Sequence, residues 1–302
     1  MRRIRHSPVA WLFVAPALAM LLIYLVYPTF WTINLSFYGG PGFIPTRFVG
    51  WDNYTRLFTL DPYFLNTSVF PPTGTVINNI IWLFLFTSLV VALGLVIAVM
   101  ADKVRYESII KSIVFMPMGI SFTAAGLIWL FMYSPDPHFG IINAILNAFT
   151  GQRISFLGDT HWATFAIIIA AVWVWTGFCT VILSAGLKGI PSDIIEAARV
   201  DGANALQIFT NIQVPMISTT ISVVIITMVI NVIKVFDLIF IMGGNQGGPL
   251  GSARVIAFTQ YVETFNNGRG GYGSAIAVIM MLTVIPIMIF NVRRFRSEEA
   301  IR

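Results

Sequence analysis

Six long apolar runs constrain this chain more than any other feature of its sequence. A helix needs about 20 mostly apolar residues to cross a bilayer, and runs of that length lie at about 10–36, 78–101, 109–133, 162–187, 213–242 and 272–292. Of the 302 residues, 10% are charged, whereas a soluble domain carries about a quarter. The sequence therefore predicts an all-α polytopic membrane protein, with six transmembrane helices in a single domain over 1–302.

Lys and Arg are unequally distributed between the two sides of a six-span arrangement. One side holds five arginines: Arg47, Arg56, Arg153, Arg254 and Arg269. The other side holds Arg2, Arg3, Arg5, Lys103, Arg105, Lys111, Lys188, Arg199, Arg293, Arg294, Arg296 and Arg302. Cytoplasmic loops carry the positive excess, so both termini and the loop at 188–212 are predicted to be cytoplasmic, and the loop at 37–77 external. The net charge of +5 therefore reflects the positive residues of the cytoplasmic side and does not indicate a nucleic-acid partner.

The loop at 188–212 joins spans four and five and is the most polar stretch between two long apolar runs. Pro191 ends the preceding helix, Ser192 is the predicted N-cap of a short helix, and Gly202 is its predicted stop. A second short helix is predicted from about Asn204 into Pro215. Two such helices suit docking into a groove of another protein, although an interfacial helix without a partner has the same pattern.

Within this loop, Glu196-Ala197-Ala198, then Gly202, then Ile212-Gln213-Val214-Pro215 resembles the Glu-Ala-Ala loop of ABC importer permeases. The usual pattern has Leu where this chain has Val214, which is a swap of similar volume. The resemblance implies a cytoplasmic coupling helix that seats in the ATPase subunit. The coupling residues that it implies are Glu196, Ala197, Ala198, Asp201, Gly202 and Pro215.

A second pattern narrows the resemblance to one branch of this family. Phe236-Asp237-Leu238-Ile239 followed by Gly247-Gly248-Pro249 is similar to the sugar-permease branch, of the maltose type. It implies one transmembrane subunit of an ATP-driven, binding-protein-dependent importer of di- or oligosaccharides in a bacterial inner membrane. The implied partners are a second, different permease subunit, a dimer of ATP-binding subunits, an extracytoplasmic sugar-binding protein and the lipid bilayer. The chain has no Gly-x-x-x-x-Gly-Lys-Ser/Thr motif, so ATP hydrolysis is assigned to the partner and not to this subunit.

Polar residues inside spans are costly and tend to face a cavity or a partner. Span five carries Asn231, Lys234 and Asp237 at helical spacing, flanked by Met228, and span four carries Trp175 and Phe178. On one interpretation Asn231 and Lys234 donate to sugar hydroxyls and the aromatic rings stack on sugar faces. On the other, Lys234 and Asp237 form a structural ion pair and the aromatic rings face lipid or a subunit.

No catalytic residue, metal site or cofactor is expected. Cys179 is the only cysteine, and the external histidines His138 and His161 lack ligand spacing. In the first external loop, Trp51, Tyr54 and Phe58 share one helical face, as in an interfacial helix or a contact with an external partner.

Three rival functions remain at this stage. The first keeps the fold and carries glycerol 3-phosphate or another small polar solute, although a phosphate favours arginines in the pathway. The second is a stand-alone secondary carrier driven by an ion gradient, and the third is a membrane-anchored structural or receptor protein.

Overall fold

The computed structural model describes residues 8–67, 73–102 and 104–299. Arg2, Arg3, Arg5, Lys103 and Arg302, on which part of the predicted charge bias depends, lie outside these ranges. The chain divides into two compact units, one from residues 1–61 with 259–283 and the other from 62–258 with 284–302. Each unit is described by itself.

The first unit begins with one long apolar helix. It consists of α1 (Pro8–Leu21), a π-helical turn (Leu22–Val26) and α2 (Tyr27–Leu35), and its residues Trp11–Leu35 are long and apolar enough to cross a membrane. A two-stranded antiparallel hairpin follows, made of β1 (Tyr38–Gly39) and β2 (Arg47–Phe48). This run corresponds to the span expected at 10–36.

The predicted helix in the first external loop is α3 (Asp52–Thr59), which is fixed to the end of α2. The Asn53 amide donates to the carbonyl oxygens of Ser36 (2.8 Å) and Tyr38 (3.0 Å). The Tyr54 hydroxyl lies 2.7 Å from the Ser36 hydroxyl, and the Trp51 ring packs edge-on against Phe37. Two of the expected face residues, Trp51 and Tyr54, therefore anchor this loop to the span before it.

The first unit is completed by a π-helical turn (Val262–Asn266) and the first turns of α16 (Gly270–Glu299). The segment Gly270–Ile289 is the last helix of the described chain that is long and apolar enough to cross a membrane. The buried Glu263 carboxylate accepts hydrogen bonds from Asn267 (2.9 Å) and Arg269 (3.2 Å) just before α16 begins.

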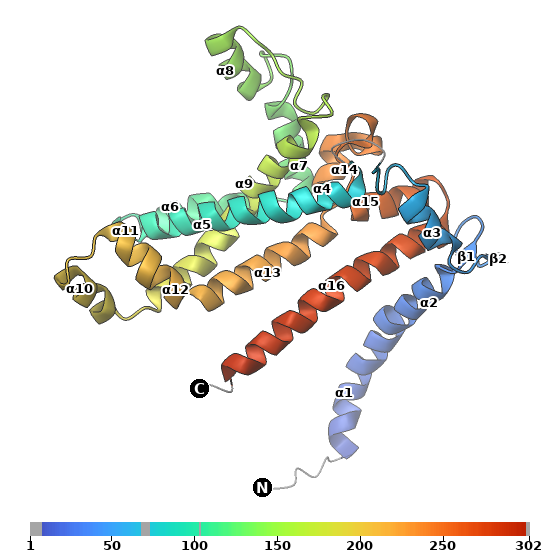
Figure 1. The fold of residues 1–302 in the computed structure, drawn as a ribbon, viewed down its shortest axis with the longest axis horizontal. Helices are drawn as coiled ribbons and strands as arrows, with labels where there is room; N and C mark the ends of the chain where they lie inside the picture. The colour runs from blue at the N-terminus through green and yellow to red at the C-terminus, as the bar shows by residue number, and fades with distance from the viewer. Residues whose placement is uncertain (1–7, 68–72, 103, 300–302) are drawn as a thin grey trace. The chain divides into compact units, whose positions relative to one another are not determined.

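The second unit is built around α9 (Ala163–Lys188), most of whose residues are buried. Along it pack α5 (Thr87–Ala101), which continues α4 (Thr75–Ile81) and a π-helical turn (Trp82–Phe86), and α6 (Glu107–Phe115) (Figure 1). Small residues allow the close approach of helices in membranes. A Cβ atom at Gly94 would lie 2.7 Å from Cys179, and one at Gly177 would lie 2.3 Å from the Val114 carbonyl oxygen.

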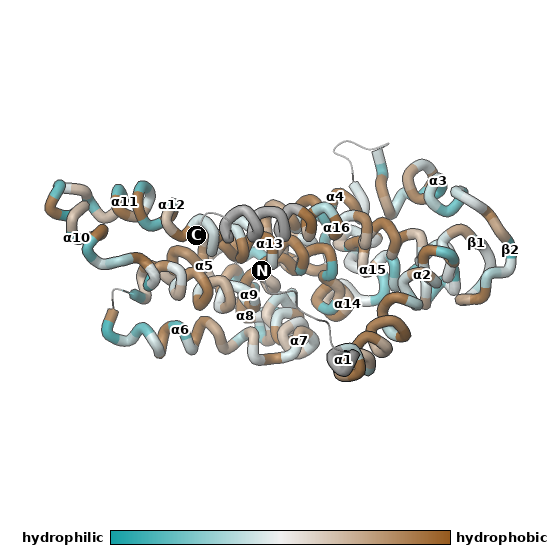
Figure 2. The backbone as a smooth tube through the Cα atoms, turned by 90° about the horizontal axis from the view of Figure 1, so that it is seen from below, coloured by the Kyte–Doolittle hydropathy of each residue, from teal (hydrophilic) through white to brown (hydrophobic). Residues whose placement is uncertain are grey.

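Two of the expected spans are bent. The run at 109–133 is α6, a 3-10 turn (Met116–Gly119) and α7 (Phe122–Met132), with a bend of 99°. Ser121 starts α7, because its hydroxyl accepts from the Ala124 amide at 3.2 Å. By length and composition the described residues contain four helices able to cross a membrane, or up to six if each bent pair is one span. Figure 2 shows hydrophobic residues along these helices, with hydrophilic ones in α3 and α11.

The run at 213–242 is not one helix. It begins in α11 (Ala205–Ile208), a π-helical turn (Phe209–Gln213) and α12 (Val214–Met216), then bends by 71° into α13 (Ser218–Lys234). Pro215 therefore lies inside α12 and does not end it, and the bend follows at Ile217. A second break separates α13 from α14 (Asp237–Gly243).

The remaining segments connect these helices. Between α7 and α9 lies α8 (Ile141–Thr150), which is tied to its flanking loop by the buried Asn143 amide. After α14, two 3-10 turns (Gly244–Gln246 and Pro249–Gly251) lead to α15 (Ile256–Tyr261). The Asn78 amide holds this glycine-rich loop by donating to the carbonyl oxygens of Ser252 (2.7 Å) and Arg254 (2.8 Å).

Candidate functional site

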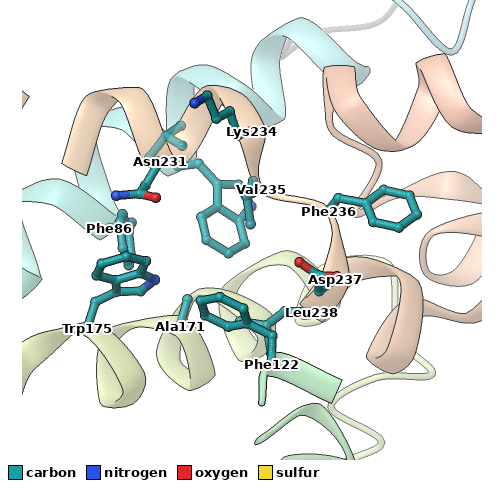
Figure 3. Close-up of a pocket in the computed structure, with 12 residues that line it drawn as sticks. Phe86, Phe122, Ala171, Trp175, Asn231, Lys234, Val235, Phe236, Asp237 and Leu238 are labelled. Carbon is teal, nitrogen blue, oxygen red and sulfur yellow. The ribbon is translucent and has the colours of Figure 1, made fainter. Parts of the chain in front are cut away.

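A cavity of about 220 Å³ in the second unit collects four of the six residues predicted to contact a cargo. Asn231 and Lys234 belong to the last turn of α13, Asp237 begins α14, and Trp175 comes from α9 (Figure 3). The rest of the lining is mostly apolar: Trp82, Phe86, Phe122, Ala171, Val232, Val235, Phe236 and Leu238. Such a lining, with a few convergent polar groups, is typical of small-molecule sites.

The break between α13 and α14 opens the backbone directly at this cavity. Val235 is extended (φ −60°, ψ 124°) and Phe236 is non-helical (φ −142°, ψ −55°). Irregular backbone at membrane depth is tolerated where it lines a cavity. The Asn79 amide donates to the Val232 carbonyl oxygen at 3.3 Å and accepts from the Ile256 amide at 2.7 Å, so one buried side chain ties the break to the following loop.

The break also separates Lys234 from Asp237. The structural ion pair considered from the sequence is not formed, because the i, i+3 geometry requires a continuous helix. In the part of the chain that the structure describes, neither side chain takes part in an ion pair, and both are exposed. Figure 3 shows the Lys234 side chain extending away from the aromatic rings, whereas the Asn231 amide lies on the side of Phe86 and Trp175.

Asn231 is partly committed to its own helix. Its amide nitrogen donates to the Thr227 carbonyl oxygen at 3.0 Å. An amide nitrogen carries two donor hydrogens and the amide oxygen two acceptor sites, so one hydrogen and the oxygen remain for a polar ligand.

The aromatic residues of α9 have different places. Trp175 stacks on Phe122, with ring centroids 6.0 Å apart, and both line the cavity. Phe178 lies outside the lining and supports Trp175 edge-on at 5.8 Å. Met228 is fully buried and also lies outside the lining. The structure therefore brings Trp175 to the cavity and leaves Phe178 and Met228 behind it.

Sequence reasoning missed the contribution of span two. Trp82 and Phe86 are the two ends of a π-helical turn, a local distortion that is frequent at functional sites. The Trp82 indole N–H is buried without a hydrogen-bond partner, and an unpaired buried donor costs about 1–3 kcal/mol. Trp82 is 1% exposed, so this unpaired donor lies within the wall of the cavity. The signal in the sequence was a cluster of aromatic residues, Trp82, Phe84 and Phe86, at the start of an otherwise aliphatic span.

The loop at 188–212 forms a second site. Its first helix is α10 (Ser192–Val200), with Pro191 as the N-cap and Ser192 as the first helical residue, so the predicted Ser192 cap is wrong. Gly202 has φ +83°. Its amide donates to the Arg199 carbonyl oxygen, and the Ala203 amide donates to the Ala198 carbonyl oxygen at 3.0 Å. These two bonds form a Schellman motif, which needs a left-handed residue at Gly202.

The second helix of the loop begins where it was predicted. Asn204 caps α11 with a reciprocal capping box, in which Gln207 N–H donates to the Asn204 side chain (2.9 Å) and Asn204 N–H donates to the Gln207 side chain (2.8 Å). Glu196, Ala197, Asp201 and Pro215 are exposed and Ala198 is half-buried. Val200 and Leu206 are 88% and 69% exposed, an unusual degree for apolar side chains beside a fixed turn.

An ionic cluster fixes the root of this loop. Lys111 of α6 contacts Asp102 (3.1 Å) and Glu107, and Lys188, the last residue of α9, contacts Glu107 at 2.6 Å. The Ser184 hydroxyl donates to Asp102 at 3.0 Å. The cluster joins the C-terminal ends of α5 and α9 to the start of α6, and Lys188 lies three residues before Pro191, where the loop turns.

The chain is similar in sequence to known transport proteins. The family described as "Binding-protein-dependent transport system inner membrane component" matches residues 90–295. The osmoprotective compounds uptake permease protein GgtC of Synechocystis sp. is 46% identical over 96% of this chain and 100% of its own length. The alpha-glucoside transport system permease protein AglF of Rhizobium meliloti is 40% identical over 98% of this chain and 85% of its own length.

A solved structure has the same fold. One chain of a bacterial ABC transporter involved in the import of the acidic polysaccharide alginate superposes with a TM-score of 0.76, at 22% identity, over 96% of this chain and 95% of its own.

The helices, the broken span and the exposed loop thus define a polytopic permease component of a transport system. The chain belongs to the family of binding-protein-dependent transport system inner membrane components, the permeases of ABC importers.

Proposed function

We propose that this chain is one transmembrane subunit of an ATP-driven importer of neutral sugars, in the di- or oligosaccharide class, and forms half of the pathway. The assignment of a sugar cargo rests on the cavity at the α13–α14 break. There Trp175 and Phe122 offer ring faces, and Trp82 and Asn231 offer polar atoms. Aromatic faces match the apolar faces of sugar rings, and N–H and C=O groups match hydroxyls. The names of GgtC and AglF support a cargo of small polar organic molecules.

The same cavity disfavours a phosphorylated cargo. A phosphate is best held by arginine side chains, and the lining contains Lys234 as its cation with Asp237 beside it. An acid and an amine together give no net positive field for a dianion. Glycerol 3-phosphate is therefore the weaker candidate.

The exposed loop at 188–212 is the contact with the ATP-binding subunits. In this proposal a dimer of ATP-binding subunits receives α10 and α11, with Glu196, Ala197, Ala198, Asp201 and Gly202 at the contact and Pro215 at the end of the loop. Val200 and Leu206 supply the apolar anchor of helix-in-groove recognition. ATP hydrolysis belongs to that partner, a second permease subunit completes the pathway, and an extracytoplasmic binding protein delivers the sugar. Both termini and the 188–212 loop are cytoplasmic by the charge bias.

Co-purification tests the coupling role. Gly202→Pro removes the N–H that closes the Schellman motif and forbids φ +83°, so the ATP-binding subunit should no longer co-purify with the detergent-solubilised chain. Gly151→Pro is the matched control, because Gly151 is also a left-handed glycine at the end of a helix, with φ +69° after α8. The proposal is refuted if both variants retain the ATPase or if the wild type never brings one down.

A further inference from the structure

The first unit contains an open cavity of about 420 Å³ that is separate from the cargo cavity and rich in arginine. Arg47 of β2, Arg56 of α3 and Arg269, just before α16, all line it, together with Asp52. The segments predicted to be external contain five Lys and Arg residues in total. Three of these five therefore line one cavity, on the side of the membrane where positive charge is scarce.

The three arginines come from different elements. Arg47 lies on β2 opposite Gly39 in the hairpin register. The Arg56 guanidinium lies 5.3 Å from the centre of the Tyr272 ring, a cation–π arrangement. Arg269 donates to the buried Glu263 at 3.2 Å, so that carboxylate is already neutralised. Neither Arg47 nor Arg56 has an ion-pair partner among the described residues.

The cavity lies level with the ends of two spans. Gly39, in its lining, is four residues beyond Leu35, where the first span ends, and Arg269 immediately precedes Gly270, where the last span begins. The headgroup region is roughly 5–8 Å deep on each face of a bilayer, and one residue of chain spans about 3.5 Å, so Arg269 lies at headgroup depth.

Exposed apolar side chains surround the same hairpin. Phe43, Ile44, Phe48 and Trp51 are 52%, 72%, 69% and 68% exposed. Trp is enriched at the level of the headgroups, and the three other side chains add exposed apolar surface beside Trp51. A cationic cavity beside exposed apolar side chains has the composition expected of a surface in contact with lipid headgroups.

We infer that this cavity binds the phosphate of an anionic phospholipid headgroup, such as phosphatidylglycerol, on the external side. Arginine is suited to this because its planar fork donates two parallel hydrogen bonds to phosphate oxygens. With Glu263 neutralised by Arg269, the lining retains Arg47 and Arg56 against Asp52, which gives a net positive charge. The bound lipid tethers the hairpin and α3 to the bilayer. This inference is independent of the cargo and of the coupling role.

Native mass spectrometry of the full chain, with whatever subunits co-purify and with added phosphatidylglycerol, tests the inference. Wild type should retain a phosphatidylglycerol adduct. Arg47→Gln and Arg56→Gln should each lower the apparent affinity about tenfold, as expected for the loss of one charged hydrogen-bond pair. Arg153→Gln, which removes an exposed external arginine of the second unit, should leave the adduct unchanged.

Asp52→Asn separates a binding effect from a folding defect, because it removes the opposing charge and should raise the affinity for the same lipid. Unchanged binding in Arg47→Gln, or weaker binding in Asp52→Asn, overturns the inference. Complete displacement of the lipid by soluble glycerol phosphate also overturns it, in favour of a site for a free anion.

Discussion

Gly177→Ala tests the packing that places the coupling loop. In α9, a Cβ atom at this position would lie 2.3 Å from the Val114 carbonyl oxygen and 2.6 Å from the Phe115 Cα atom. Ordinary contacts begin at 3.4 Å, so α6 would have to move by about 1 Å, and both obstructing atoms belong to the backbone. Overpacking of this kind costs about 1–3 kcal/mol, and we expect the upper part of that range because no side chain can rotate away.

The effect should appear in both stability and coupling. A loss of about 2–3 kcal/mol lowers Tm by several degrees, measured in detergent by differential scanning fluorimetry. Because α6 carries Lys111 and Glu107 of the ionic cluster, sugar-stimulated ATPase activity of the assembled importer should fall as well.

Gly119→Ala is the matched control for this substitution. No atom lies within 4 Å of a Cβ at Gly119, and surface substitutions of this kind stay within about 0.5 kcal/mol. If Gly177→Ala melts at the temperature of the wild type, or if Gly119→Ala is the less stable of the two, then α6 does not pack on α9 as described.

Three further predictions concern the cavity and the cluster. Trp82→Phe removes the unpaired indole N–H but keeps an aromatic ring, and it should weaken sugar-dependent uptake about fivefold, as the loss of one neutral hydrogen bond implies. Trp129→Phe removes an equally unpaired N–H outside the cavity lining and should leave uptake unchanged. Equal effects of the two substitutions would contradict a role of Trp82 in binding the sugar. Asn79→Ala should lower the free energy of unfolding by about 1–3 kcal/mol, measured by thermal melting, because it frees the Val232 carbonyl and the Ile256 amide. Lys111→Met removes the cation that Asp102 and Glu107 share, leaves Lys188 paired with Glu107, and should lower the melting temperature. This effect should shrink at high salt, and an unchanged melting temperature at low salt would argue against the cluster.

Much of the fold is predictable from the sequence because hydropathy and punctuation act locally. The apolar runs mark the helices, Gly202 marks the end of α10 and Asn204 marks the start of α11. The shapes of spans three and five are harder to predict, because the bends at Ser121 and Ile217 and the break at Val235 lie inside apolar stretches. At these points tertiary contacts, such as the Asn79 hydrogen bond to Val232, support a broken backbone that composition does not reveal.

The polar residues of the candidate cavity could be predicted from the sequence, but the rest of its lining could not. Asn231, Lys234 and Asp237 stood out because polar residues in a span require a reason, and they do lie at one cavity. Helical spacing alone could not show that Phe178 and Met228 turn away, nor that Trp82 and Phe86 of another span complete the lining. Those facts depend on how α9, the π-helical turn and α13 pack together, and local periodicity contains no information about that.

Uptake of labelled sugar into proteoliposomes tests the central claim most directly. The chain is reconstituted with its co-purifying subunits and supplied with the binding protein outside and ATP inside. We predict uptake that requires both ATP and the binding protein, that is lost in Gly202→Pro and that persists in Gly151→Pro. Uptake without ATP that follows an imposed ion gradient would contradict the account and identify a secondary carrier.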